Sequence, residues 1–117
     1  MYRIAIPNWR PATDNELINC HWRTKHKLKQ SDAEMVACYA RLADVPDAKS
    51  KRKVSLEITL CGRQKKTDKF AYCKSFLDGL VTARILVDDN DEFMEWGGVT
   101  WTRGRESQTV IVLEDVE

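Results

Sequence analysis

Three aspartates stand at positions where together they could hold a divalent cation. Asp88 and Asp89 are adjacent and follow the apolar pair Leu86–Val87, and Asp68 opens the helical pattern that precedes them. Carboxylates gathered beside cations make sense if Mg²⁺, or Mn²⁺, lies between them and phosphate oxygens. Such an ion activates water and stabilises charge in phosphodiester hydrolysis. Metal-dependent phosphoryl chemistry is therefore one interpretation; the other is that Asp68 caps a helix and the adjacent pair ends a strand in water.

Lys74 lies six residues after Asp68, nearly two turns further along the same predicted helix. Beside a scissile phosphate, its ammonium group would stabilise the charge that develops as the bond breaks. The alternative is an i,i+4 ion pair with Asp78, worth about 0.3 kcal/mol. The spacing of these residues is compatible with both roles.

The net charge of +1 conceals a strong asymmetry along the chain. Residues 1–85 hold 17 Lys and Arg against 9 Asp and Glu, whereas residues 86–117 hold 2 against 9. Basic clusters replace the counterions of a polyanion, so the basic part predicts a nucleic-acid partner, with a purely solubilising role as the alternative. A further cluster spans residues 49–53, and the candidate DNA contacts are Arg23, Lys25, Lys27, Lys29, Arg63, Lys65 and Lys66.

The elements that must position these residues fit one α+β domain over residues 1–117. Apolar alternation predicts strands over 2–6, 54–60 and 109–113, a short strand at 86–87, and a hairpin around Gly97–Gly98. Helical spacing predicts a helix over 31–43, opened by a capping box of Ser31 and Glu34, and a second over 68–83. We expect a small mixed sheet of about five strands with two main helices.

The cysteines and the hydropathy pattern limit the cellular setting. Cys20, His21 and His26 raise the possibility of zinc, but structural zinc sites bring their ligands in close pairs, and no CxxC pair occurs. Buried, reduced thiols are the expectation for an intracellular protein. No apolar run approaches the roughly 20 residues of a membrane span, and the N-terminal apolar stretch is too short for a signal peptide. We expect a cytoplasmic protein without a membrane partner.

The spacing of the acids also resembles the RusA family of Holliday junction resolvases, which are carried mostly by phages and prophages. In that family an Asp-x-Asp-Asn-x-x-Lys motif opens a helix, Asp-x-Leu follows, and a strand ends in Asp-Asp. This chain reads TDKFAYCKSFLDGLVTARILVDD there. The segments IAIPNWRPATDN, SDAEMVACYARLA and KVSLEITL resemble the family's first strand and loop, its first helix and its next strand, so the resemblance covers nearly the whole chain. The positions in register are Asp68, Lys74, Asp78, Leu80, Asp88 and Asp89.

The resemblance implies a RusA-like fold and a function in DNA recombination and repair. A homodimer would hold a four-way DNA junction on its basic faces and nick two symmetric strands. Asp68, Asp88 and Asp89 would hold Mg²⁺. Asp68, Asp89 and Lys74 would be the catalytic residues.

The chain departs from the family motif at two positions. The family's second helix Asp falls on Phe70, and its Asn falls on Ala71. Phe cannot ligate a hard cation, and Ala cannot donate the amide contact. The chain could therefore be a weakened or inactive nuclease, with Glu57 as a conceivable replacement ligand, or a catalytically dead DNA-binding module of the same fold. A protein-interaction domain with incidental charge is the third interpretation, since fold does not fix function.

Overall fold

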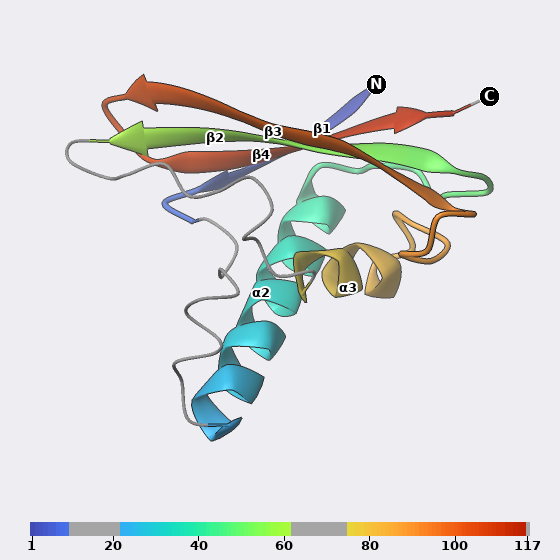
Figure 1. Ribbon diagram of the computed structural model, residues 1–117, viewed down its shortest axis with the longest axis horizontal. Coiled ribbons are helices and arrows are strands. Elements are labelled where there is room, and N and C mark those ends of the chain that lie inside the picture. Colours follow the sequence, from blue (N-terminus) through green and yellow to red (C-terminus); the bar gives the residue numbers. More distant parts are fainter. Residues whose placement is uncertain (10–21, 62–74, 117) are drawn as a thin grey trace.

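The computed structural model describes residues 1–9, 22–61 and 75–116, which form four strands and two helices (Figure 1). The α+β class and the mixed sheet are confirmed, with four strands in these ranges where about five were predicted. In chain order the elements are β1 (Tyr2–Pro7), α2 (Trp22–Leu42), β2 (Arg52–Cys61), α3 (Ser75–Thr82), β3 (Met94–Gly104) and β4 (Gln108–Asp115).

The last strand of the chain lies inside the sheet, whose strand order is β1-β4-β2-β3. β4 pairs antiparallel with both β1 and β2, so these two strands run parallel to each other without touching. β2 and β3 form a parallel pair. Parallel strands need a crossover connection, and here α2 and α3 supply the helices of the two crossovers.

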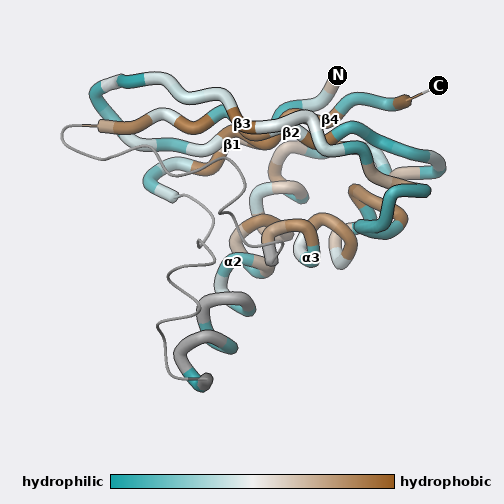
Figure 2. Tube along the Cα trace, viewed as in Figure 1, coloured by the Kyte–Doolittle hydropathy of each residue, from teal (hydrophilic) through white to brown (hydrophobic). Residues whose placement is uncertain are grey.

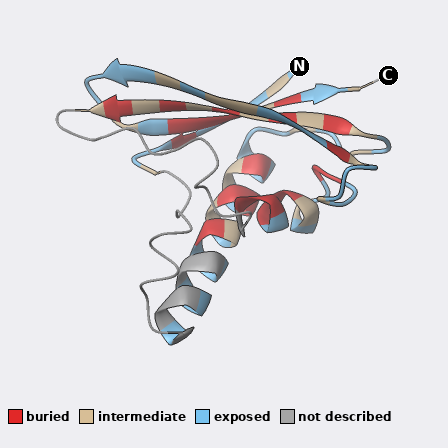
Figure 3. Ribbon diagram, in the orientation of Figure 1, coloured by how far each residue is buried: buried red, intermediate tan, exposed pale blue. Residues whose placement is uncertain are grey.

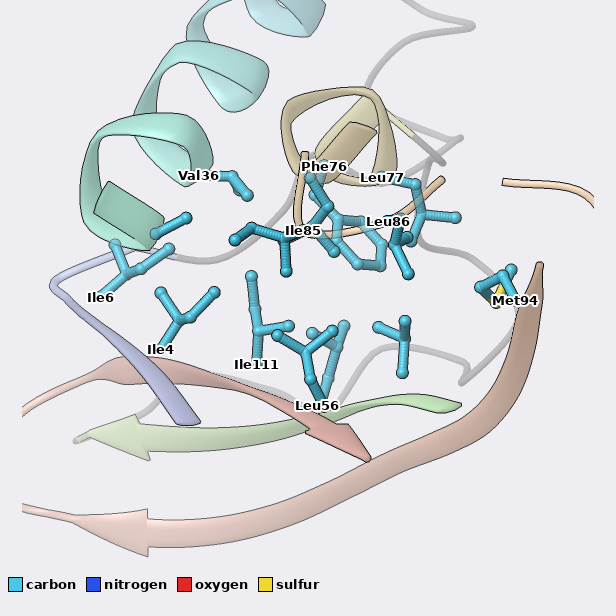
Figure 4. Close-up of a cluster of buried hydrophobic side chains, with 14 of the residues drawn as sticks. Ile4, Ile6, Val36, Leu56, Phe76, Leu77, Ile85, Leu86, Met94 and Ile111 are labelled. Carbon is cyan, nitrogen blue, oxygen red and sulfur yellow. The ribbon is translucent and has the colours of Figure 1, made fainter. Parts of the chain in front are cut away.

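Both described helices lie on the same face of the sheet, and no described helix covers the other face (Figure 1). The core forms between that sheet face and the helices, where buried side chains gather (Figure 3). Side chains from β1, β2 and β4 meet Val36 of α2 and Phe76 and Leu77 of α3 (Figure 4). Each such side chain, once buried, contributes about 1.5–3 kcal/mol of hydrophobic stabilisation.

Strict alternation in β2 sets which side of the sheet faces the helices. Val54, Leu56, Ile58 and Leu60 are at most 2% exposed, whereas the intervening side chains are half-buried on the other face. A period of two places alternate side chains on opposite faces, so this strand was predicted with its inward residues correct. The predicted final strand is also confirmed as β4.

The hairpin predicted around Gly97–Gly98 is wrong: both glycines lie inside the single strand β3. Both halves of β3 pair with β2. Between Trp96 and Val99, β3 advances by three residues while β2 advances by two, which is a β-bulge. Gly98 has φ 93°, and a Cβ on Gly97 would lie 2.1 Å from Ser55 Oγ. The glycine pair therefore permits a bulge in β3. The partner of β3 is the parallel strand β2, because the chain crosses over through α3.

Two further boundaries differ from the prediction. The first helix begins at Trp22, not at Ser31, so the capping-box residues lie within α2. Residues 22–30 contain no Gly or Pro and include several good helix formers, and these preferences override the local capping signal. Residues 86–87 form a bend, not a strand, because Leu86 N–H donates to Leu80 O where the chain turns off α3.

The predictions about membrane spans and about the cysteines can be compared with the structure. Within the described ranges, no helix is both long and apolar enough to cross a membrane. Cys38 is exposed and Cys61 half-buried, so the expectation of buried thiols is wrong for Cys38. It lies on the solvent side of α2, away from the stripe that Val36 and Ala40 present to the core. Cys20 and Cys73 fall outside the described residues.

The α2–α3 contact depends on Gly79. A Cβ at this position would lie 2.5 Å from Ala33 O and 2.9 Å from Val36 Cβ. We expect Gly79→Ala to lower the free energy of unfolding by about 1–3 kcal/mol, because overpacking outweighs the gain in helix propensity. Chemical denaturation measures the change. The exposed Thr82→Ala in the same helix is the control, expected within about 0.5 kcal/mol of the parent. A Gly79→Ala protein as stable as the parent would contradict this packing.

Candidate functional site

The acids predicted to hold a metal lie in the acid loop, which we define as residues 85–93, between α3 and β3. The loop begins at a Schellman cap: Ile85 N–H donates to Leu80 O (2.9 Å) and Arg84 N–H to Val81 O (3.0 Å). Arg84 takes the left-handed conformation that such a cap requires, with φ 65°. The cap buries Ile85 and directs the following residues towards the start of β3.

Hydrogen bonds within the loop hold Asp88 and organise the turn. Asp88 Oδ1 accepts from the Asp89 N–H (2.7 Å), and its Oδ2 accepts from Asn90 Nδ2 (3.2 Å). Asn90 Oδ1 in turn accepts from the Glu92 N–H (3.1 Å). The Phe93 and Met94 N–H groups both donate to Asn90 O. Asp and Asn side chains commonly stabilise turns in this way, so Asp88 has a structural role whether or not it binds a metal.

A basic segment of the chain lies directly beside the acid loop. Residues 46–51 precede β2, and the acid loop precedes β3; because β2 and β3 are parallel, both segments meet the same edge of the sheet. Ala48 N–H donates to Arg84 O (2.9 Å), which joins the two segments. Figure 2 shows the hydrophilic parts of both segments near each other at one end of the sheet. We call residues 46–51 the basic connector.

Cations and carboxylates therefore emerge side by side at this edge. Lys49 and Arg84 are both exposed. Lys49 directly follows Ala48, whose N–H donates to the backbone oxygen of Arg84. Asp88 is exposed and Asp89 is half-buried a few residues further on. Cations next to acids can bind a phosphate directly, while the acids take phosphate oxygens only through a metal ion.

The acid loop has donor atoms suited to a hard cation, but few of them. A carboxylate has about four lone-pair positions, so the two hydrogen bonds of Asp88 leave acceptor capacity on its oxygens. Mg²⁺ is commonly held by one or two carboxylates together with substrate phosphates and waters. Asp88 and Asp89 fit that requirement. Among residues 1–9, 22–61 and 75–116, no three His, Cys, Asp or Glu side chains gather as a metal site on their own.

The remaining predicted site residues are only partly described. Asp68, Lys74, Arg63, Lys65 and Lys66 lie outside the described residues, as do Phe70 and Ala71. Arg23 and Lys27 are exposed on the first turns of α2. Lys25 and Lys29 lie on the same turns, where their side chains are not described. These turns project away from the sheet and from the acid loop, so α2 does not bring its basic end to Asp88 and Asp89 (Figure 1).

Glu57 does not join the acids. Its side chain lies on the face of the sheet that carries no helix, where it forms an ion pair with Arg3 across β4. The acid loop follows α3, on the opposite side. Glu57 is therefore not a replacement for the carboxylate that Phe70 removes. Of the tryptophans of β3, Trp101 packs against the core, whereas Trp96 is 37% exposed and its ring centroid lies 6.1 Å from that of Phe76.

Arg52, the first residue of β2, links the acid loop to the rest of the fold. It is 3% exposed, and its Nε donates to Asp115 Oδ1 (2.8 Å). The guanidinium lies over the Tyr2 ring, 4.9 Å from its centroid, and the Tyr2 hydroxyl donates to Asp115. The hydrogen bond from Arg52 is the main cause that holds the pKa of Asp115 below its usual value.

Sequence reasoning missed three residues of this region. Arg52 counted only within the basic cluster of residues 49–53, Arg84 only among the cations of residues 1–85, and Asn90 received no role. Turn chemistry in the stretch DDND could have identified Asn90. Nothing local distinguishes Arg52 from Lys51 or Lys53, because its role comes from segments far away in the chain.

Comparisons with known proteins add no assignment. A scan against protein-family models and a search of the curated proteins find no match to this chain.

The depressed pKa of Asp115 predicts how stability depends on pH. The Arg52–Asp115 contribution is fully present above the unfolded-state pKa, about 3.9, and is lost as pH falls through the lower folded-state value. Asp115→Asn should therefore be less stable than the parent at pH 7, with the difference shrinking below about pH 4. Denaturation at several pH values measures this. Glu106→Gln, an exposed change at the β3–β4 turn, is the control. A difference that stays constant down to pH 2 would contradict the prediction.

Proposed function

We propose that the protein is a Mg²⁺-dependent endonuclease of the resolvase kind, acting on branched DNA. One observation supports this most strongly: the parallel β2–β3 pair places the basic connector beside the acid loop. The resemblance to the RusA family rests on the same acids, Asp88 and Asp89.

The side chains at this edge have complementary tasks in such an enzyme. Lys49 and Arg84 would contact the DNA backbone, which positions the substrate without reading its sequence. Asp88 and Asp89, together with Asp68, would hold Mg²⁺. When bound, the ion would supply an activated water and neutralise charge on the phosphate. Lys74 would stabilise the charge that develops on the scissile phosphate.

A homodimer would present two such edges to a four-way junction and allow two symmetric nicks. The first turns of α2, which carry the exposed cations Arg23 and Lys27, lie well away from the acid loop (Figure 1). They would therefore contact arms of the junction away from the nicked strand.

A DNA-binding module without catalysis is the second candidate. Phe70 stands where the family motif has an Asp, and Ala71 where it has an Asn. Glu57 does not replace the lost carboxylate, since it pairs with Arg3 on the far side of the sheet. Binding and cleavage therefore need separate tests.

Binding is tested with a labelled four-way junction, by fluorescence anisotropy in EDTA over a range of salt concentrations. Arg84→Gly removes a cation beside the acid loop without strain, because glycine accepts φ 65° readily. We expect the slope of log K against log[salt] to fall in magnitude by about 1, at unchanged or slightly higher stability. Arg105→Gly, at the β3–β4 turn at the other end of the sheet, is the matched control and should change the slope less.

Equal slopes for Arg84→Gly and the parent would exclude this edge as a DNA contact. No binding to any DNA structure at low salt would favour a protein-interaction domain.

Cleavage is tested with the same junction in Mg²⁺ or Mn²⁺. We expect symmetric nicks, and Asp89→Asn should slow them roughly 100-fold or more, because a ligand to the ion is lost. Junction binding in EDTA should remain. Intact junctions after long incubation of the parent with either metal would exclude the nuclease and leave the binding module.

The double change Phe70→Asp with Ala71→Asn tests the cause of any inactivity. If the parent binds but does not cleave, the double variant should gain metal-dependent cleavage, since it restores the family's carboxylate and amide. A variant that binds as the parent does and still does not cleave would show that these two positions are not what disabled the site.

A further inference from the structure

Arg52 contacts both ends of the acid loop. Its Nη1 donates to Ile85 O (3.0 Å), at the first residue of the loop. Its backbone N–H donates to Phe93 O (3.1 Å), at the last. The same Nη1 donates to Pro46 O (2.9 Å), at the start of the basic connector. Arg52, the first residue of β2, therefore links the acid loop to the basic connector.

The geometry of these contacts requires a guanidinium group. Arginine presents several N–H donors in a rigid plane, so it can reach a carboxylate from Nε and two carbonyls from Nη1 at once. A lysine ammonium is a compact group on a flexible stem and cannot hold all three acceptors in the same arrangement. Asp115 supplies the opposite charge that a buried arginine needs, and the Tyr2 ring covers the guanidinium.

Arg52 makes these contacts from a buried position. Its side chain is 3% exposed, and its hydrogen bond to Ile85 O is buried, so water does not compete for that carbonyl. The acid loop itself is mostly exposed between its ends, from Val87 to Glu92. Its conformation therefore depends on its own hydrogen bonds around Asn90 and on where its two ends are held.

We propose that Arg52 is a positioning residue for Asp88 and Asp89: its guanidinium fixes the first end of the acid loop at Ile85, and so places their carboxylates for metal and phosphate binding. This rests on the proposed function for the metal. Residues that orient the ligands of an ion typically change its affinity by roughly 10- to 100-fold when they are mutated.

The test variant is Arg52→Lys in the full chain, which keeps the charge and loses the planar donors. Amide hydrogen exchange followed by NMR reports the loop directly. We expect exchange at Ile85 and Leu86, whose N–H groups donate to Leu80 O at the end of the loop that the guanidinium holds, to become roughly tenfold faster, the effect of losing one ordinary hydrogen bond, while amides in the centre of β4 keep their rates. Unchanged exchange in the loop, or equal acceleration throughout the sheet, would overturn the positioning role.

The second readout is the Mn²⁺ concentration needed for half-maximal junction cleavage. Arg52→Lys should raise it roughly 10- to 100-fold, leave the junction affinity in EDTA unchanged, and approach the parent's rate at saturating Mn²⁺. A variant that merely folds poorly would lose binding too and would not be rescued by metal. Such a joint loss, or an unchanged Mn²⁺ requirement, would overturn the proposal.

Asp115→Asn is the matched control, since it changes the charge partner of Arg52 without touching Ile85 or Phe93. It should lower stability at neutral pH and leave the Mn²⁺ requirement near the parent's. If the parent itself does not cleave, the proposed nuclease fails, and Mn²⁺ broadening of the Asp88–Glu92 amide signals replaces cleavage as the metal readout. Broadening in the parent that needs more Mn²⁺ in Arg52→Lys supports the proposal; equal requirements, or no broadening, overturn it.

Discussion

The antiparallel pairing of β4 with both β1 and β2 holds the sheet together. Without β4, β1 would have no partner strand, because it runs parallel to β2 but is separated from it by one strand position. β4 also brings Ile111 and Leu113 to the centre of the core, between the inward residues of β1 and β2. The N-terminal half of the fold thus depends on a strand made last, at the other end of the chain.

The same arrangement explains why the candidate site lies where it does. With β4 beside β2 on one side, β3 pairs with β2 on the other, and the crossover through α3 makes that pair parallel. Parallel strands begin at the same edge, so the segments that precede β2 and β3 become neighbours. The basic connector and the acid loop, about 40 residues apart in the chain, meet there for that reason alone.

Arg52 and Asp115 connect this edge to the ends of the chain. Asp115 is the last residue of β4, and Tyr2 the first of β1; both contact the guanidinium that also holds Ile85 and Pro46. One guanidinium therefore contacts the start of the acid loop, the basic connector and the ends of β1 and β4. In this ion pair Arg52 is buried and Asp115 is exposed, so its contribution to stability is modest, but it specifies how the segments around it are arranged.

Local patterns determined much of this protein from the sequence alone. The alternation in Val54–Leu60 identified a strand and its inward face, because a period of two admits no other arrangement with a buried side. The apolar spacing in residues 75–82 identified a helix, and the adjacent acids and the basic segments were visible by inspection. The tertiary structure decided what those patterns are next to: Gly97–Gly98 forms a bulge because β3 meets β2, Glu57 faces away from the acids, and Arg52 reaches carbonyls that no local pattern connects to it. Neighbours along the chain set periodicity and turn chemistry. Strand order and crossover connections depend on contacts between distant segments. The entropy cost of closing the loops between those segments, and the surface that the contacts bury, are not encoded in any short stretch of sequence.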